Sequence, residues 1–181
     1  MRNFYLSLLF IIQLCSNLSC SSNGSGKYNK PDKATKYKVI SIDDGDTFDI
    51  LMENKTIKIR MDAIDAPEKG MPYWKKSKQF LADLVFNKEV TIKIVDIDGR
   101  GRTVARSYLE DGTDVSLEMV KAGLAWHYKK FNKDPILADL EKQAIAQKIG
   151  LWNDPNPYNP EYIRKLHKQG ISTKDTFRQK K

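Results

Sequence analysis

Residues 60 to 68, RMDAIDAPE, place one arginine and three carboxylates within nine positions, and a proline interrupts the run. The charged residues are Arg60, Asp62, Asp65 and Glu68. Carboxylates this close together repel one another, so the arrangement has a free-energy cost unless a cation lies among them. The cluster therefore predicts a bound cation, and the elements around it must indicate which cation that is.

The cluster follows a predicted strand. In TIKIRM, residues 56–61, Ile59 and Met61 lie on one side, while Lys58 and Arg60 face away from the core. Further short strand patterns occupy residues 36–42, 47–51, 89–95 and 102–109. Five short strands without an alternation of strand and helix favour a small closed barrel, here a five-stranded barrel of the OB type.

Three helices packed on this barrel would complete an α+β fold. They are expected from Pro72 to about residue 86, over 116–123 with Ser116 as a cap candidate, and over 134–150 with Asp134 at the start. The positions expected at the buried face of the longest helix are Ile136, Leu140 and Ala144.

The first twenty residues resemble a targeting segment. They have one positive charge at Arg2, an apolar stretch over residues 4–14 and then small polar residues, which is typical of a secretory signal peptide. Both cysteines, Cys15 and Cys20, lie in this segment, so the rest of the chain cannot form an internal disulfide. We therefore expect an exported protein.

Cys20 also fits a bacterial lipoprotein processing site, although Asn17 stands where leucine is usual. Cys20 would then be acylated and hold the protein at the membrane, with residues 21–35 as a flexible tether. A cell-envelope lipoprotein, a freely secreted protein and an uncleaved anchor are the three alternatives. Behind the tether we expect a folded domain over 36–153 and a basic, proline-containing tail over 154–181.

The composition indicates a soluble globular protein with a basic surface. The chain has 181 residues, a mean hydropathy of −0.55, a net charge of +8 and a pI of about 9.3. One domain of ordinary size accounts for this length. The charge favours a polyanionic partner, either nucleic acid or anionic lipid, without choosing between them.

Five phrases stand in order along the chain. They are DDGDTFDI at 43–50, IRMDAIDAPE at 59–68, GRGRTVARSYLEDG at 99–112, GLAWHY at 123–128 and AQKIGLW at 146–152. In this order and spacing they closely resemble the thermonuclease, or staphylococcal nuclease, family. The resemblance extends from about residue 37 to residue 152.

The resemblance implies a metal site and a catalytic set. The metal ligands would be Asp46, Asp65 and the backbone carbonyl of Ala66. The best-known member has threonine at the last position, and a main-chain ligand should tolerate the change. The catalytic residues implied by the family are Arg60, Glu68 and Arg102.

The resemblance also points to two substrate-binding residues. In the loop DGRGR, residues 98–102, Arg100 replaces a tyrosine that contacts nucleotide in the best-known member. A guanidinium can still bind phosphate and stack on a base. Tyr128 is the candidate for the remaining aromatic contact.

The chemistry of this set is consistent with hydrolysis of a phosphodiester. Two carboxylates and a carbonyl form an oxygen site suited to Ca²⁺ or Mg²⁺ and poor for Zn²⁺, and His127 and His167 lie outside the acidic phrase. The metal would act as a Lewis acid, the arginines would neutralise phosphate charge, and Glu68 would position or deprotonate the attacking water.

The resemblance implies a nuclease that uses one Ca²⁺ ion, hydrolyses DNA and RNA and leaves 3′-phosphate ends; export is expected from the first twenty residues, and a monomer is assumed. The alternative from another class is a non-catalytic, OB-fold nucleic-acid-binding surface lipoprotein. A third hypothesis is a surface lipoprotein whose basic tail binds anionic polymers, and the acidic cluster itself could be a fold-stabilising ion cluster. The presence of all five charged site residues favours the enzyme. His127 is expected to lie at the surface or to pack rather than to act as a base, Trp152 is expected in the core, and residues 96–99 are expected to form a hairpin turn.

Overall fold

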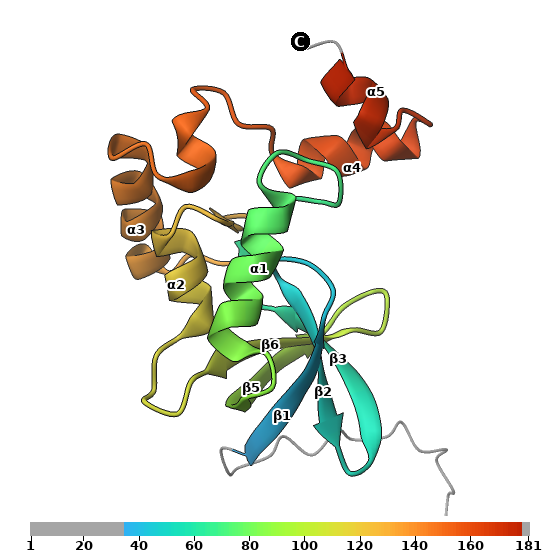
Figure 1. The fold of residues 1–181 in the computed structure, drawn as a ribbon, viewed down its shortest axis with the longest axis vertical. Coiled ribbons are helices and arrows are strands. Elements are labelled where there is room, and N and C mark those ends of the chain that lie inside the picture. The colour runs from blue at the N-terminus through green and yellow to red at the C-terminus, as the bar shows by residue number, and fades with distance from the viewer. Residues whose placement is uncertain (1–34, 179–181) are drawn as a thin grey trace, which may run out of the picture.

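The computed structural model describes residues 35–178, apart from the side chains of Lys174 and Arg178. Five strands form a closed barrel in the order β1-β2-β3-β6-β5 (Figure 1). These strands are β1 (Thr35–Ile42), β2 (Thr47–Met52), β3 (Lys55–Met61), β5 (Glu89–Ile97) and β6 (Thr103–Tyr108). The predicted five-stranded barrel and the α+β class are confirmed. The predicted signal peptide, Cys20 and nearly all of the tether lie outside the described residues.

The barrel is held by antiparallel pairs except at its closure, where β3 and β6 run parallel. Alternation along β3 buries Ile59 and Met61 and leaves Arg60 between them on the outer face, as predicted. The parallel register pairs Ile59 with Thr103 and Arg60 with Val104. The start of β6 therefore lies beside the end of β3, next to the acidic phrase.

A second, two-stranded sheet consists of β4 (Ile64–Asp65) and β7 (Trp126–His127), which pair antiparallel. The sequence pattern did not predict it, because two residues are too few for an alternation to be recognised. This small sheet joins the acidic phrase to the GLAWHY phrase.

The three predicted helices are present as α1 (Trp74–Val85), α2 (Val115–Lys121) and α3 (Pro135–Ala146), followed by a 3₁₀ turn, η1 (Gly150–Asn153). The α1 helix begins two residues later than expected. The predicted cap of α2 was wrong: Asp114 accepts the N–H groups of Ser116 and Leu117. The Ser116 hydroxyl is buried and instead donates to the Asp62 carbonyl at 3.0 Å.

The first residue predicted for the buried face of α3 was wrong by one position. Asp134 caps the helix as expected, but Ile136 is 58% exposed, and Leu137 and Glu141 are buried in its place. Ala144 is buried as predicted, because it shares a face with these two residues. Trp152 is half-buried, with its ring centroid 5.8 Å from that of Trp126.

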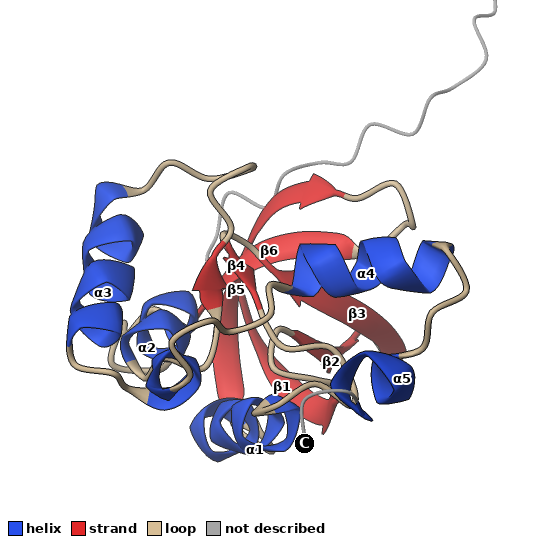
Figure 2. Ribbon diagram, turned by 90° about the horizontal axis from the view of Figure 1, so that it is seen from above, coloured by secondary structure: helices blue, strands red, loops and turns tan. Residues whose placement is uncertain are grey.

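The C-terminal tail contains two helices that the sequence pattern did not predict, α4 (Pro160–Lys168) and α5 (Thr173–Arg178). They lie above one end of the barrel, and α4 is on the opposite side from α3 (Figures 1 and 2). None of the helices between residues 35 and 178 has the length and apolar character needed to cross a membrane.

Candidate active site

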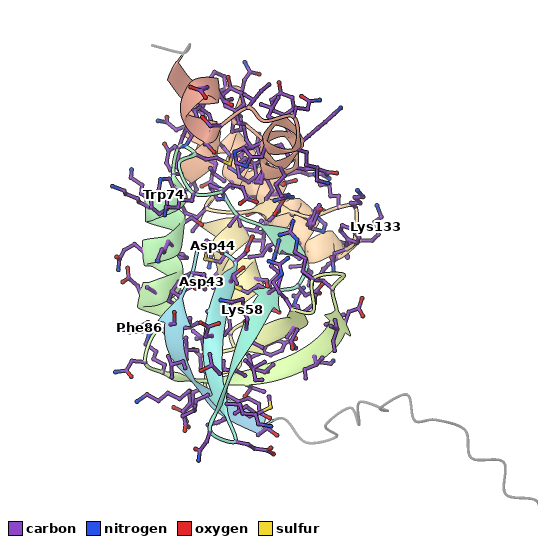
Figure 3. The ribbon with its side chains drawn as sticks, turned by 90° about the vertical axis from the view of Figure 1, so that its right-hand side faces the viewer. Asp43, Asp44, Lys58, Trp74, Phe86 and Lys133 are labelled. Atoms are coloured by element: carbon purple, nitrogen blue, oxygen red, sulfur yellow. The ribbon has the colours of Figure 1, made fainter. Side chains whose placement is uncertain are left out.

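The first group of aspartates lies in the turn between β1 and β2. The N–H groups of Asp43 and Asp44 donate to the Thr47 carbonyl at 2.9 and 3.3 Å, and the Asp46 N–H donates to the Asp44 carboxylate at 3.0 Å. Figure 3 shows Asp43 and Asp44 near Lys58 of the neighbouring β3. The turn therefore gathers its carboxylates at one end of the barrel.

Gly45 allows this turn to approach the rest of the site. A Cβ atom at Gly45 would lie 1.8 Å from Ser77 Oγ and 2.8 Å from Ala66 Cβ. No side chain fits there unless α1 or the acidic phrase moves. The glycine therefore fixes the distance between the turn and Ala66.

Backbone hydrogen bonds align the acidic phrase with the turn. Met61 N–H donates to the Asp46 carbonyl at 2.8 Å, and Ala66 N–H donates to Asp46 Oδ2 at 2.6 Å. Between these two contacts Ala63 has a φ of 68°, in the left-handed region, where the chain turns from β3 into β4. Two segments twenty residues apart thus meet at a single carboxylate.

Arg60 brings the two predicted metal ligands together. Its Nη2 atom lies 3.2 Å from Asp46 Oδ2 and 3.1 Å from Asp65 Oδ1, and it also donates to the Ile64 carbonyl at 2.9 Å. The side chains of Asp46 and Asp65 are 8% and 4% exposed, and that of Arg60 is 11% exposed. Because both aspartates contact the same nitrogen, their carboxylates are close neighbours in a buried site.

A second guanidinium, which the sequence analysis missed, enters the site from α4. Arg164 Nη2 lies 2.7 Å from Asp65 Oδ2, and its Nη1 lies 3.1 Å from Asp65 Oδ1 and 2.7 Å from Glu68 Oε1. No motif marks Arg164, which follows Asp65 by 99 positions. The sequence does contain a helix-start signal before Arg164, with Asn159 as cap and Pro160 in the first turn. That signal could have predicted that Arg164 lies on a helix.

Asp44 contributes a third carboxylate to the site. It was not among the site residues predicted from the sequence. Burial, and then the charge of Asp46, raise the pKa of Asp44 to about 7. Burial likewise raises the pKa of Asp65, with Asp46 adding to the effect and Arg164 and Arg60 opposing it. Both pKa shifts arise mainly from removal of the carboxylate from water, and the negative charge of Asp46 adds to them.

The donor set fits a hard cation. Asp44, Asp46 and Asp65 offer only oxygen; Asp46 and Asp65 are buried, and Asp44 is half-buried. The charge of Asp46 opposes ionisation of the other two, which is the environment that Ca²⁺ or Mg²⁺ relieves. Within residues 35–178 no group of three or more His, Cys, Asp or Glu side chains is already arranged to hold a metal ion. The carboxylates of Asp46 and Asp65 are instead paired with Arg60 and Arg164.

The structure does not bring Arg102 into this cluster. Its Nε and Nη2 atoms both lie 2.7 Å from Asp98 Oδ2, in the β5–β6 hairpin turn that was predicted at this place. Arg102 directly precedes β6, two residues before Val104, the partner of Arg60, so alternation places Arg102 and Arg60 on one face of the barrel. The arginine lies on the correct face but is paired with another residue.

The two predicted substrate-binding residues lie in separate loops. Arg100 is exposed and is joined to Asp98 through its backbone N–H at 2.9 Å. Tyr128 follows β7, and its N–H donates to the Ala63 carbonyl at 2.8 Å. Its ring lies edge-on to Phe131, which is 69% exposed, with the centroids 4.8 Å apart. Tyr128 is therefore fixed to the turn that leads into Asp65.

The remaining charged and polar candidates lie outside the cluster. Asp62 faces Arg106 at 3.9 Å rather than the other carboxylates. His127 is buried, with its Nε2 atom 3.2 Å from Asn132 Oδ1, and its backbone N–H donates to Glu141. Of the two places expected for His127, the surface or the packed interior, the structure shows the interior.

The comparisons with known proteins agree with this fold. The family model described as staphylococcal nuclease homologue matches residues 58–154, more than half of the chain. An uncharacterized endonuclease of Haemophilus influenzae is 43% identical over 132 residues, which are 72% of this chain and 74% of that protein.

Two further relatives carry nuclease names. An uncharacterized endonuclease of Escherichia coli is 40% identical over 123 residues, covering 68% of this chain and 80% of the relative. A micrococcal nuclease of Shigella flexneri is 37% identical over 145 residues, covering 75% and 83%. Together with the closed barrel, these matches show that the chain belongs to the staphylococcal nuclease family and is a nuclease-type hydrolase.

Proposed function

We propose that this protein is an exported nuclease that hydrolyses phosphodiester bonds of DNA and RNA with one Ca²⁺ ion and leaves 3′-phosphate ends. The observation that supports it most is the oxygen cluster of the buried Asp46 and Asp65 and the half-buried Asp44, beside Arg60. A cluster of this charge requires a cation, and a phosphodiester requires both a cation and hydrogen-bond donors.

The proposed metal ligands are Asp46, Asp65 and the carbonyl of Ala66. When bound, the ion supplies Lewis-acid polarisation of a phosphate oxygen. Asp46 is pre-positioned for this role, because Ala66 N–H and the Thr47 hydroxyl, at 2.6 and 3.0 Å, hold its two oxygens. A buried, hydrogen-bonded carboxylate loses little conformational freedom on binding a cation.

Arg60 and Glu68 have separate proposed roles. Arg60 is fixed by the carbonyl of Ile64 and by two carboxylates, so its guanidinium can donate to a phosphate oxygen without first being ordered. The Glu68 side chain is 33% exposed, which leaves it access to water. Glu68 would hold the attacking water and accept its proton.

Arg102 is proposed as the second phosphate-binding arginine, and Arg100 and Tyr128 as substrate contacts. Phe131 extends the aromatic surface next to Tyr128 and is available for stacking on a base. Lys130 lies over the Phe131 ring at 5.6 Å and adds positive charge to the same loop. This surface is suited to single-stranded nucleic acid.

Export and attachment are proposed from the sequence. Residues 1–20 would direct secretion, and acylation of Cys20 would hold the enzyme at the cell envelope through the 21–35 tether; free secretion is the alternative. We propose a monomer as the active form.

The decisive experiment is incubation of the chain from residue 21 onward with single-stranded DNA and with RNA, in EGTA and with added Ca²⁺. We expect cutting only with Ca²⁺, and products that a polymerase extends only after phosphatase treatment, because a 3′-phosphate blocks extension. Asp46→Asn should abolish cutting, while Asp139→Asn, an exposed aspartate on α3, should not. Full activity in EGTA would refute the metal assignment, and binding without cutting would favour the non-catalytic alternative.

A further inference from the structure

Arg164 occupies the carboxylates that the proposed function assigns to metal and water. Its two terminal nitrogens contact both oxygens of Asp65, at 3.1 and 2.7 Å, and one of them also contacts Glu68 at 2.7 Å. A guanidinium that binds a carboxylate through two parallel hydrogen bonds is a strong and directional cation. Burial would lower the pKa of Arg164, but the bonds to Asp65 and Glu68 hold that pKa above its ordinary value, so the group is charged.

An ordered element delivers this guanidinium. The neighbouring Ile163 is fully buried in a second hydrophobic cluster with Met71, Trp126 and Leu151. Leu166 of α4 packs against the same cluster, as does Phe177 of α5. The C-terminal helices, which lie above one end of the barrel (Figure 1), are therefore docked through this second cluster. Docking of α4 places Arg164 within hydrogen-bond distance of Asp65.

The contacts leave Asp65 fully engaged by cations. Asp65 Oδ1 accepts from Arg60 and from Arg164, and Asp65 Oδ2 accepts from Arg164. A divalent cation that binds Asp65 would meet a guanidinium on the same oxygens, and two cations at one buried carboxylate repel each other strongly. A metal ion that binds Asp65 therefore competes with Arg164 for the same carboxylate oxygens.

We propose that Arg164 is a built-in counter-ion of the metal-free site, and that the C-terminal helix α4 sets the metal affinity by competing for Asp65 and Glu68. The proposal rests on the proposed Ca²⁺ site. Displacement of Arg164 by the metal would also release Glu68 to hold water, so that the general base becomes available only when the metal has bound.

The test is calorimetric titration of the chain from residue 21 onward with Ca²⁺ alone. We expect Arg164→Gln to bind Ca²⁺ at least tenfold more tightly than the wild type. The matched control is Lys165→Gln, which removes the same charge from the next position of the same helix, where the side chain is exposed. Lys165→Gln should change the affinity less than twofold.

Arg164→Lys keeps the charge but cannot form the two-pronged contact, so its affinity should lie between those of the wild type and Arg164→Gln. This variant serves as the second test if Arg164→Gln does not fold. Unchanged or weaker Ca²⁺ binding in the folded Arg164 variants would overturn the proposal. Wild-type binding that Asp46→Asn abolishes and the Arg164 variants do not change would refute the competition alone. No binding by any of these proteins would refute the Ca²⁺ site as well.

Discussion

Arg60 is predicted to stabilise the fold as well as to serve the reaction. Its guanidinium lies between Asp46 and Asp65, and these three side chains are 11%, 8% and 4% exposed. Arg60→Ala would leave two buried carboxylates with fewer cations. Among the described residues, Asp46 forms its only ion pair with Arg60, whereas Asp65 would keep Arg164.

The expected cost follows from this difference. Removing one partner of a buried ion pair costs about 3–5 kcal/mol, because the other charge is left uncompensated. Since Asp65 retains a counter-ion, we expect the lower end of that range, about 3 kcal/mol for metal-free protein at neutral pH. For a domain of this size the midpoint of thermal unfolding should fall by roughly 10 °C.

Lys58 provides a matched control on the same strand and the same outer face. It also pairs with two aspartates, Asp43 and Asp49, but its side chain is 43% exposed. Exposed pairs contribute about 1 kcal/mol or less, so Lys58→Ala should change the stability little. The comparison separates the effect of burial from the mere loss of a positive charge.

The assay is urea unfolding of the wild type, Arg60→Ala and Lys58→Ala, each in EGTA and in Ca²⁺. Ca²⁺ should restore part of the loss in Arg60→Ala, because a bound cation again neutralises Asp46. Equal stability of Arg60→Ala and wild type in EGTA would refute the reasoning that Arg60 is the counter-ion of the buried carboxylates.

Three further predictions concern other parts of the chain. Arg102→Ala should lower the turnover number by roughly a hundredfold or more. Arg100→Ala should mainly weaken oligonucleotide binding, and this effect should be smaller at high salt. Kinetics of both variants at two salt concentrations test this, and severe loss of turnover in Arg100→Ala with intact binding would mean that the roles are reversed. In metal-free protein the Asp44 pKa of about 7 lies above its unfolded value of about 3.9, so the folded state binds the extra proton and stability should fall as pH rises from about 4 to 7. Asp44→Asn should reduce that fall in thermal melts in EGTA, leaving the part that the raised pKa of Asp65 contributes, and an unchanged pH profile would contradict the assignment. Cys20→Ala should shift the protein from the detergent phase to the aqueous phase, and wild-type protein found free in the medium with an N-terminus beyond Cys20 would exclude the lipoprotein.

The barrel could be predicted from the sequence because strand alternation is a local property. The pattern of TIKIRM assigned Ile59 to the core and Arg60 to the outer face before any tertiary contact was known. The buried face of α3 was harder to predict, since Ile136 and Leu137 are neighbouring apolar residues and only the packing partner decides which one is buried. Local pattern therefore determined the strands better than the helix faces.

The site residues that are close together in the sequence could be predicted, whereas those that come together only on folding could not. Arg60, Asp65 and Glu68 stand within nine positions, so their mutual proximity was readable from the sequence. Arg164 comes to Asp65 only because Ile163 packs into a cluster with Met71, Trp126 and Leu151. A basic tail has no periodicity that identifies which of its cations will reach a carboxylate.

Arg102 and Arg164 are each paired with an aspartate in this structure, and the two ion pairs differ in how easily they separate. Arg102 and Asp98 are 28% and 23% exposed, so water and a substrate phosphate can compete for the guanidinium, and pairs at the surface are worth about 1 kcal/mol or less. Arg164 binds an Asp65 side chain that is only 4% exposed, and moving it would leave Asp65 with Arg60 alone, which Asp65 shares with Asp46, unless another cation arrives. Arg102 can therefore turn toward a phosphate when substrate binds, whereas Arg164 requires the metal first. The acidic cluster predicted a bound cation from the sequence alone. In the proposed order the metal replaces Arg164 first and Arg102 turns to the substrate afterwards, so metal binding would be the step that makes the site available.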